Sequence, residues 1–128
     1  MAQILPKLIS LGTSVPSHRI TQADVISILA EAKGQALPPR MAEILGNTGI
    51  SQRHIAMPPE YYFNPRSWAG RARVYENTAA QMFEAAAMQA LARAGVKAAE
   101  IGQIVFVSTT GTMTPSLPSR MIASMGFA

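Results

Sequence analysis

Hydroxyl side chains gather directly after a short apolar run in the last quarter of the sequence. The run covers residues 104–107 and reads Ile-Val-Phe-Val, which is typical of a strand buried on both faces of a parallel sheet. The hydroxyl residues that follow it are Ser108, Thr109, Thr110, Thr112 and Thr114. In open α/β sheets, ligands bind at the carboxyl ends of the strands. These hydroxyls could hydrogen-bond a ligand or satisfy backbone groups of a turn, and the residues alone leave both interpretations open.

A second group of interest is the segment 48–56, Thr-Gly-Ile-Ser-Gln-Arg-His-Ile-Ala. It places Arg53 a few residues after Gly49. An arginine in an ordered, glycine-containing loop can hold a phosphate or pyrophosphate by charge-assisted hydrogen bonds. The alternative is that Arg53 pairs with a carboxylate or caps a helix.

Other catalytic chemistries lack the residues they need. The chain has two histidines, His18 and His54, and no cysteine, which excludes a Cys-His pair and a disulfide framework within this sequence. We predict no metal site, because two isolated histidines do not form a ligand cluster. The sequence contains neither a P-loop nor a Gly-x-Gly-x-x-Gly motif, so nucleotide hydrolysis and dinucleotide binding are unsupported.

Composition indicates a folded protein of 128 residues, with 48% hydrophobic and only 14% charged residues. So little charge predicts surface that another chain or further sequence covers. The net charge is +4, but the basic residues are scattered, so we expect no nucleic-acid partner. No apolar run reaches the ~20 residues of a membrane span, and the N-terminus lacks the pattern of a secretory signal. A cytoplasmic location is the expectation.

The elements expected to position these groups are two strands and several helices. We predict strands over 8–11 and 103–108, and we expect 47–68 to be irregular because of its prolines. Thr21 is predicted to cap a helix that ends at Gly34, with Asp24 as its capping-box partner. Further helices are predicted over 41–45, 71–94 and 117–125. This order indicates an α/β layered fold with too few strands for a finished sheet.

Four blocks, in order along the chain, resemble bacterial type III polyketide synthases, which are relatives of the chalcone synthases in the thiolase superfamily. Residues 12–22 resemble the family's G-T-x-x-P-x-x-R-x-T-Q opening, and 48–56 resemble a T-G-I-x-x-R-x-I-A block shared with ketoacyl synthase III enzymes. Residues 91–107 resemble A-L-x-x-A-G-x-x-x-x-x-I-x-x-I-V-F-V. Residues 108–121 resemble S-T-T-G-x-x-T-P-S-L-x-x-R-[LM], which fits the polyketide synthase branch better.

The resemblance implies roles for particular residues. It associates Arg53 with the coenzyme A arm of the substrate, and it places Thr109 and Thr110 on the cavity side of their loop. Met113 and Thr114 would lie at a dimer interface, where Thr114 helps to wall the partner subunit's cavity. The family's catalytic Cys-His-Asn triad lies downstream of these blocks, so no residue of this chain is expected to be catalytic. Pro118 departs from the family's frequent acidic residue.

Residues 1–128 are therefore expected to form the incomplete N-terminal half of a thiolase-like α/β/α fold, truncated before the catalytic cysteine. The implied activity of the full-length enzyme is iterative decarboxylative condensation of malonyl-CoA onto an acyl-CoA starter, followed by cyclisation. It would need no cofactor beyond these CoA thioesters and would act as a homodimer. Two alternatives stay open on the sequence: a ketoacyl synthase III-like condensing enzyme and a non-catalytic interaction module. The residues that follow position 128, or a genuine end of the reading frame there, would distinguish them.

Overall fold

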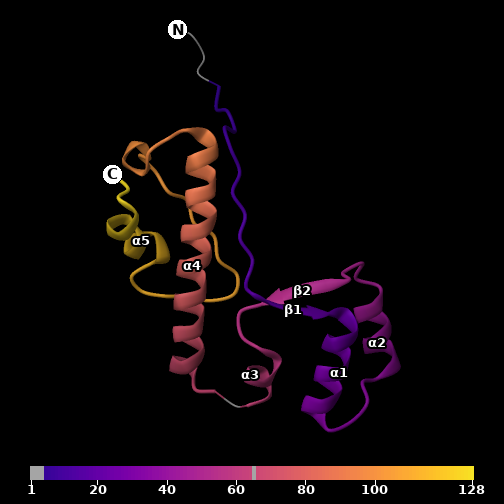
Figure 1. The fold of residues 1–128 in the computed structure, drawn as a ribbon. Helices are drawn as coiled ribbons and strands as arrows, with labels where there is room; N and C mark the ends of the chain where they lie inside the picture. The colour runs from indigo at the N-terminus through magenta and orange to yellow at the C-terminus, as the bar shows by residue number, and fades with distance from the viewer. Residues whose placement is uncertain (1–4, 65) are drawn as a thin grey trace. The chain divides into compact units, whose positions relative to one another are not determined.

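The structure is a computed structural model that describes residues 5–64 and 66–128. It divides the chain into two compact units. One unit is Val15–Ser67, and the other combines the described part of Met1–Ser14 with Trp68–Ala128 (Figure 1).

The unit Val15–Ser67 is built around a small two-stranded sheet. Strands β1 (His18–Thr21) and β2 (Gln52–Ile55) pair in antiparallel fashion, with His18 opposite Ile55 and Thr21 opposite Gln52. Between them come helices α1 (Gln22–Lys33) and α2 (Pro39–Gly46), and the short helix α3 (Pro59–Phe63) follows β2. The sequence did not predict this two-stranded sheet, because each strand has only four residues and lies among turn-forming residues.

Both ends of α1 form as predicted. The Asp24 backbone N–H donates to the Thr21 hydroxyl oxygen at 3.1 Å, and the Thr21 backbone N–H donates to the Asp24 carboxylate at 2.7 Å. This reciprocal arrangement satisfies two N–H groups that a helix start otherwise leaves without partners. Gly34 ends the helix with φ of 65°, a left-handed conformation that glycine adopts without steric cost.

The second unit is organised along α4 (Trp68–Ala94), a 27-residue helix that ends at the predicted residue and begins before the predicted start at 71. A short 3-10 turn, η1 (Ala98–Glu100), and an extended stretch lead to α5 (Leu117–Met125), whose bounds agree with the prediction. Helix α5 packs on α4 (Figure 1). Within the described residues, Leu117 (1% exposed) and Met121 (7% exposed) are the two buried hydrophobic residues. The core of this unit therefore lies between α5 and α4.

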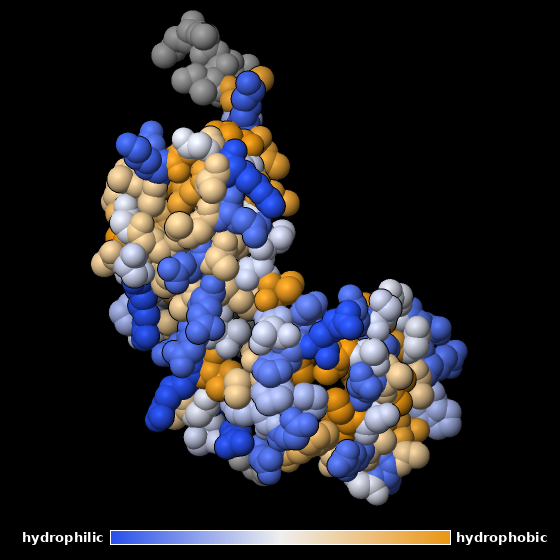
Figure 2. Space-filling view, viewed as in Figure 1, coloured by the Kyte–Doolittle hydropathy of each residue, from blue (hydrophilic) through white to orange (hydrophobic). Residues whose placement is uncertain are grey.

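The two predicted strands, 8–11 and 103–108, are wrong as paired strands. Both segments form no ladder with any described residue. Their apolar side chains are not buried either, since Leu8 is 87% exposed, Val105 80% and Val107 82%. The pattern identified apolar segments suited to a sheet interior, but pairing requires neighbouring strands, which these residues do not supply. Apolar (orange) surface is accordingly visible in Figure 2.

The small side chains of α4 admit close approach by the N-terminal extended segment, which runs beside the helix in Figure 1. The Ser10 hydroxyl donates to the Ala90 carbonyl oxygen at 2.8 Å, and Arg93 Nη1 donates to the Leu11 carbonyl oxygen at 2.6 Å. At the next residue, a Cβ on Gly12 would lie 1.9 Å from the Ala86 carbonyl oxygen. Only glycine fits at this position, so the segment is held to one register on the helix.

We predict that the cap of α1 makes the stability of the chain depend on pH. The pKa of Asp24 is lowered because the Thr21 hydroxyl, and then the Thr21 backbone N–H, donate hydrogen bonds to its carboxylate. A pKa below the unfolded value of 3.8 means that the carboxylate stabilises the fold above that pH, and that this contribution is lost as the pH falls through the lower folded value.

The measurement is the free energy of unfolding of the wild type and of Asp24→Ala, in urea, from about pH 6 down to about pH 3. The two proteins should differ at the upper end and converge at the lower end. Thr21→Ala should cost about 1 kcal/mol at neutral pH. Ser27→Ala is the matched control, because the Ser27 hydroxyl bonds only back to the Ala23 carbonyl oxygen of its own helix. A constant difference across the pH range would contradict the role given to Asp24.

Candidate functional site

Arg53 occupies the middle of β2, opposite Ile20 of β1, and is half-buried. Its Nε donates to the Gln22 side-chain oxygen at 3.2 Å. The partner is a neutral amide, so the alternative of an ion pair with a carboxylate is not what the structure shows. No described residue offers a hydrogen-bond or ion-pair partner to the two terminal nitrogens of Arg53.

Gln22 explains why Arg53 is held in this orientation. Its Nε2 donates to the Leu45 carbonyl oxygen at 2.6 Å, and its backbone N–H donates to the Ser51 carbonyl oxygen at 3.0 Å. Thr48, whose hydroxyl also donates to Leu45 O, fixes the turn that leads into β2. One side chain therefore joins α1, the end of α2 and β2. The result is an ordered arginine with an uncompensated positive charge, which is suited to binding an anion.

The loop after the apolar run is held by its serine and by a tyrosine of α4. The Tyr75 hydroxyl and Ser108 Oγ are 2.7 Å apart, and Ser108 Oγ donates to the Gly111 carbonyl oxygen at 3.0 Å. Gly111 lies against the Tyr75 ring, since a Cβ on it would be 2.5 Å from the ring carbon Cγ. Ser108 thus satisfies a backbone carbonyl of the turn, which is one of the two possibilities that the sequence left open for the hydroxyl cluster.

The threonines have a different environment. Thr109, Thr110 and Thr114 are exposed, and none of their side chains forms a hydrogen bond with a described residue. Met113 is half-buried. Because Ser108 and Tyr75 already satisfy the turn, the threonine hydroxyls are left available to a ligand or to another chain.

The far end of the loop is tied to α4 as well. Arg120 of α5 forms an ion pair with Glu76 at 3.3 Å, and both side chains are partly exposed. In addition, Ser116 and Ser119 bond to each other at 2.8 Å across the first turn of α5. Pro118, which departs from the pattern of the resembled family, is accommodated in this first turn.

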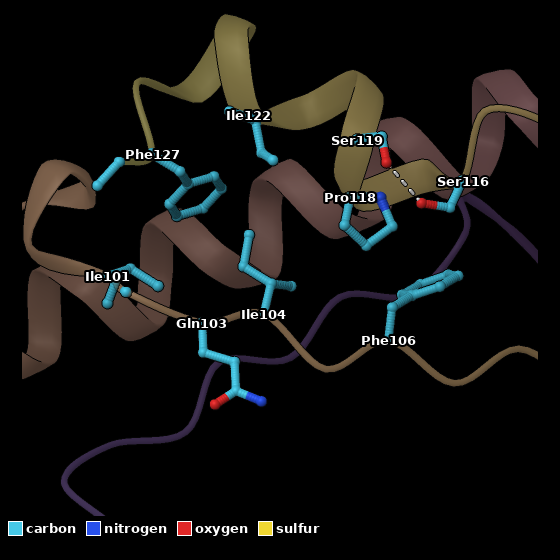
Figure 3. Close-up of a pocket in the computed structure, with 11 residues that line it drawn as sticks. Ile101, Gln103, Ile104, Phe106, Ser116, Pro118, Ser119, Ile122 and Phe127 are labelled. Atoms are coloured by element: carbon cyan, nitrogen blue, oxygen red, sulfur yellow. Dashed lines mark hydrogen bonds between the residues drawn. The ribbon is translucent and has the colours of Figure 1, made fainter.

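A cavity of about 410 Å³ lies between α5 and the extended stretch that precedes the loop. Figure 3 shows Ile104, Ile122 and Phe127 around it, with the Ser116–Ser119 bond at one end. Its lining combines apolar side chains with polar groups and includes none of the predicted site residues. The cavity is therefore distinct from the loop that carries the threonines.

The structure brings together some of the predicted site residues. Thr109, Thr110, Met113 and Thr114 share one loop, whereas Arg53 belongs to the other unit. Sequence reasoning missed Tyr75 and Gln22, which organise the loop and the arginine. Neither has a local signature, because each acts on residues about 30 positions away. In the part of the chain that the structure describes, no three acidic, histidine or cysteine side chains are placed to hold a metal ion. The helices of residues 5–64 and 66–128 do not combine the length and the hydropathy that a membrane span requires.

Comparison with known proteins gives these features a context. Phloroglucinol synthase of Pseudomonas fluorescens Pf-5 is 36% identical over 110 residues, covering 84% of this chain and 31% of that protein. The 1,3,6,8-tetrahydroxynaphthalene synthase of Streptomyces coelicolor A3(2) is 36% identical over 118 residues, covering 91% of this chain and again 31% of the relative. The chain thus spans about a third of the length of the curated relatives it matches. No protein-family model matches it.

Solved structures agree. The crystal structure of 1,3,6,8-tetrahydroxynaphthalene synthase from Streptomyces coelicolor A3(2), a bacterial type III polyketide synthase, matches 93% of this chain and 35% of its own, with a TM-score of 0.83 and 33% identity. PKS-I from the brown alga Ectocarpus siliculosus matches with a TM-score of 0.79 at 21% identity, which supports the fold alone.

The fold is therefore part of a thiolase-like α/β fold, as the resemblance predicted. Within that class, the chain belongs to the type III polyketide synthase family.

We predict that Gly111→Ala will disrupt the loop. The new Cβ would meet three ring carbons of Tyr75 at 2.5–2.7 Å, and the ring cannot move without breaking its bond to Ser108. Overpacking of this kind costs about 1–3 kcal/mol, measurable by urea unfolding. Gly102→Ala is the matched control, because a Cβ there meets nothing within 4 Å. Equal stability of the two variants would show that the Tyr75 contact does not constrain the loop.

Proposed function

We propose that this chain forms part of a type III polyketide synthase that condenses malonyl-CoA units onto an acyl-CoA starter and cyclises the product. The observation that carries the proposal is the 36% identity to a tetrahydroxynaphthalene synthase over 91% of this chain. The match is spread over the whole chain, so it is far more specific than a single short motif.

The reaction sets clear requirements on the complete enzyme. A thiolate takes up the starter as a thioester, and decarboxylation of malonyl-CoA then supplies the enolate that attacks it. Donors that stabilise the enolate and tetrahedral oxyanions are also needed. This chain has no cysteine, so the nucleophile comes from the part of the relatives that it does not span. The contribution of the chain is substrate binding and positioning.

Arg53 is proposed to bind a phosphate of the coenzyme A arm. The terminal nitrogens of this guanidinium have no partner among the described residues, and Gln22 fixes the group through Nε. A guanidinium held by one edge presents its remaining donors as a fork suited to phosphate oxygens.

Thr109, Thr110 and Thr114 are proposed to line the polyketide cavity, and Met113 and Thr114 to lie at a homodimer interface. Their exposure supports this role, as does the attachment of the loop backbone by other residues. CoA thioesters are the only small molecules that the proposal requires, with no further cofactor, and the complete enzyme is proposed to be cytoplasmic.

The exposed segments 8–11 and 103–108 are proposed to become strands of a larger sheet in the complete enzyme. Val105 and Val107 alternate with other apolar residues and are more than three-quarters exposed, which suits the interior of a sheet.

We expect the 128-residue chain alone to have no condensing activity. With labelled malonyl-CoA and a fatty acyl-CoA, it should give neither polyketide nor covalent acyl-protein, because no thiol is present. A chimera in which residues 1–128 replace the matching segment of the Streptomyces coelicolor enzyme should form product from malonyl-CoA. A stable acyl adduct on the isolated chain, or an inactive but folded chimera, would contradict the proposal.

In that chimera, Arg53→Ala should raise KM for the CoA substrate more than it lowers kcat. A contact remote from the reacting carbon binds substrate and transition state equally. Loss of one charge-assisted bond corresponds to about 1.5–3 kcal/mol, or roughly 10- to 160-fold in KM. Arg40→Ala, at an exposed arginine of α2, is the matched control for loss of charge. An unchanged KM would leave Arg53 with a structural role only.

A further inference from the structure

The hydrogen bonds around Ser108 have a defined direction. Ser108 has one hydroxyl proton, and it is donated to the Gly111 carbonyl oxygen, which can only accept. The Tyr75 hydroxyl, 2.7 Å from Ser108 Oγ, is therefore the donor in that pair. The result is a chain of bonds from Tyr75 through Ser108 to Gly111, and donors and acceptors connected in series polarise one another.

Tyr75 contacts the loop at two points, one on either side of the two threonines. Its hydroxyl meets Ser108, and its ring lies against Gly111. Thr109 and Thr110 are the two residues between these points, and both are exposed. Thr109 and Thr110 form the tip of the loop. Because Ser108 and Gly111 on either side are fixed, the direction in which this tip presents its hydroxyls is determined.

The next residue of α4 holds the other end of the same segment. Glu76 pairs with Arg120 of α5 at 3.3 Å, while Leu117 and Met121 bury their side chains against α4. Consecutive residues of one rigid helix therefore hold the segment from both ends. A small change at Tyr75 alters the tip without releasing α5.

We propose that Tyr75 is a positioning residue that sets the product specificity of the enzyme by orienting the loop tip at Thr109 and Thr110. This inference rests on the proposed function, because it takes the tip to be part of the cavity wall. The tyrosine does not touch the reacting atoms. It acts through Ser108 and Gly111, so its effect falls on where the growing chain lies rather than on the chemical step.

The test uses the chimera described above and the variant Tyr75→Phe, which removes the hydroxyl and keeps the ring. Loss of one hydrogen bond should change the ratio of the main product to shorter or differently cyclised products by about two- to tenfold. KM for malonyl-CoA should stay within about twofold, since no binding contact is removed. Ser108→Ala should reproduce the change in ratio, because it interrupts the same chain of bonds.

Tyr62→Phe is the matched control. It also removes a tyrosine hydroxyl, one that accepts a long bond of 3.4 Å from the Met57 backbone N–H in the other unit. A merely destabilising loss of a hydroxyl would affect the amount of active enzyme, but it would leave the product ratio and KM unchanged. An unaltered ratio in Tyr75→Phe, or an equal change in Tyr62→Phe, would overturn the inference.

A spectroscopic measurement on the 128-residue chain separates this inference from the proposed function. The Tyr75 ring lies over Gly111, so the Gly111 Hα signals should be shifted upfield by its ring current. Tyr75→Leu should abolish that shift, and Tyr75→Phe should reduce it and move the methyl signals of Thr109 and Thr110. If the unsubstituted chimera is inactive, the proposed function fails and the specificity role with it, while these signals still report whether Tyr75 orients the loop. If the threonine signals do not move, the positioning role is wrong even in an active chimera.

Discussion

The packing of the unit that contains α4 depends on the length of this helix and on the small side chains along it. Its alanines leave the helix backbone accessible, so the segment around Gly12 approaches within contact of the Ala86 carbonyl group. At the other end of the helix, Tyr75 and Glu76 hold the loop and α5. Leu117 and Met121 are the only buried residues among the described hydrophobic ones. Specific polar contacts to this helix therefore provide much of the structural definition that a larger core would otherwise give.

The sequence predicted those parts of the structure whose causes are local. The capping box of Thr21 and Asp24 and the left-handed Gly34 follow from interactions within a few residues, and α5 begins and ends at the residues expected. The apolar segments 8–11 and 103–108 were recognised by pattern, but a strand exists only where a neighbour pairs with it. The pairing of β1 with β2 joins residues more than 30 positions apart and has no local signal.

The candidate site follows the same rule. Arg53 and the threonine cluster could be found from residue type and context, and the family resemblance assigned them roles. Their supports could not be found in this way. Gln22 was given no role of its own, yet it joins three elements and fixes the arginine. Residues that orient a site are determined by tertiary contacts. Residues that contact a ligand are constrained by its chemistry, and a short motif can therefore reveal them.

The attachment of the N-terminal segment to α4 has a consequence for biosynthesis. Ser10 bonds to Ala90 and Leu11 to Arg93, separations of 80 and 82 residues. A ribosome adds roughly 5–20 residues per second, so the apolar segment waits about 4–16 s before its partner helix has been made. The contacts of Ser10 and Leu11 with α4 therefore cannot form until nearly the whole of this helix has been synthesised.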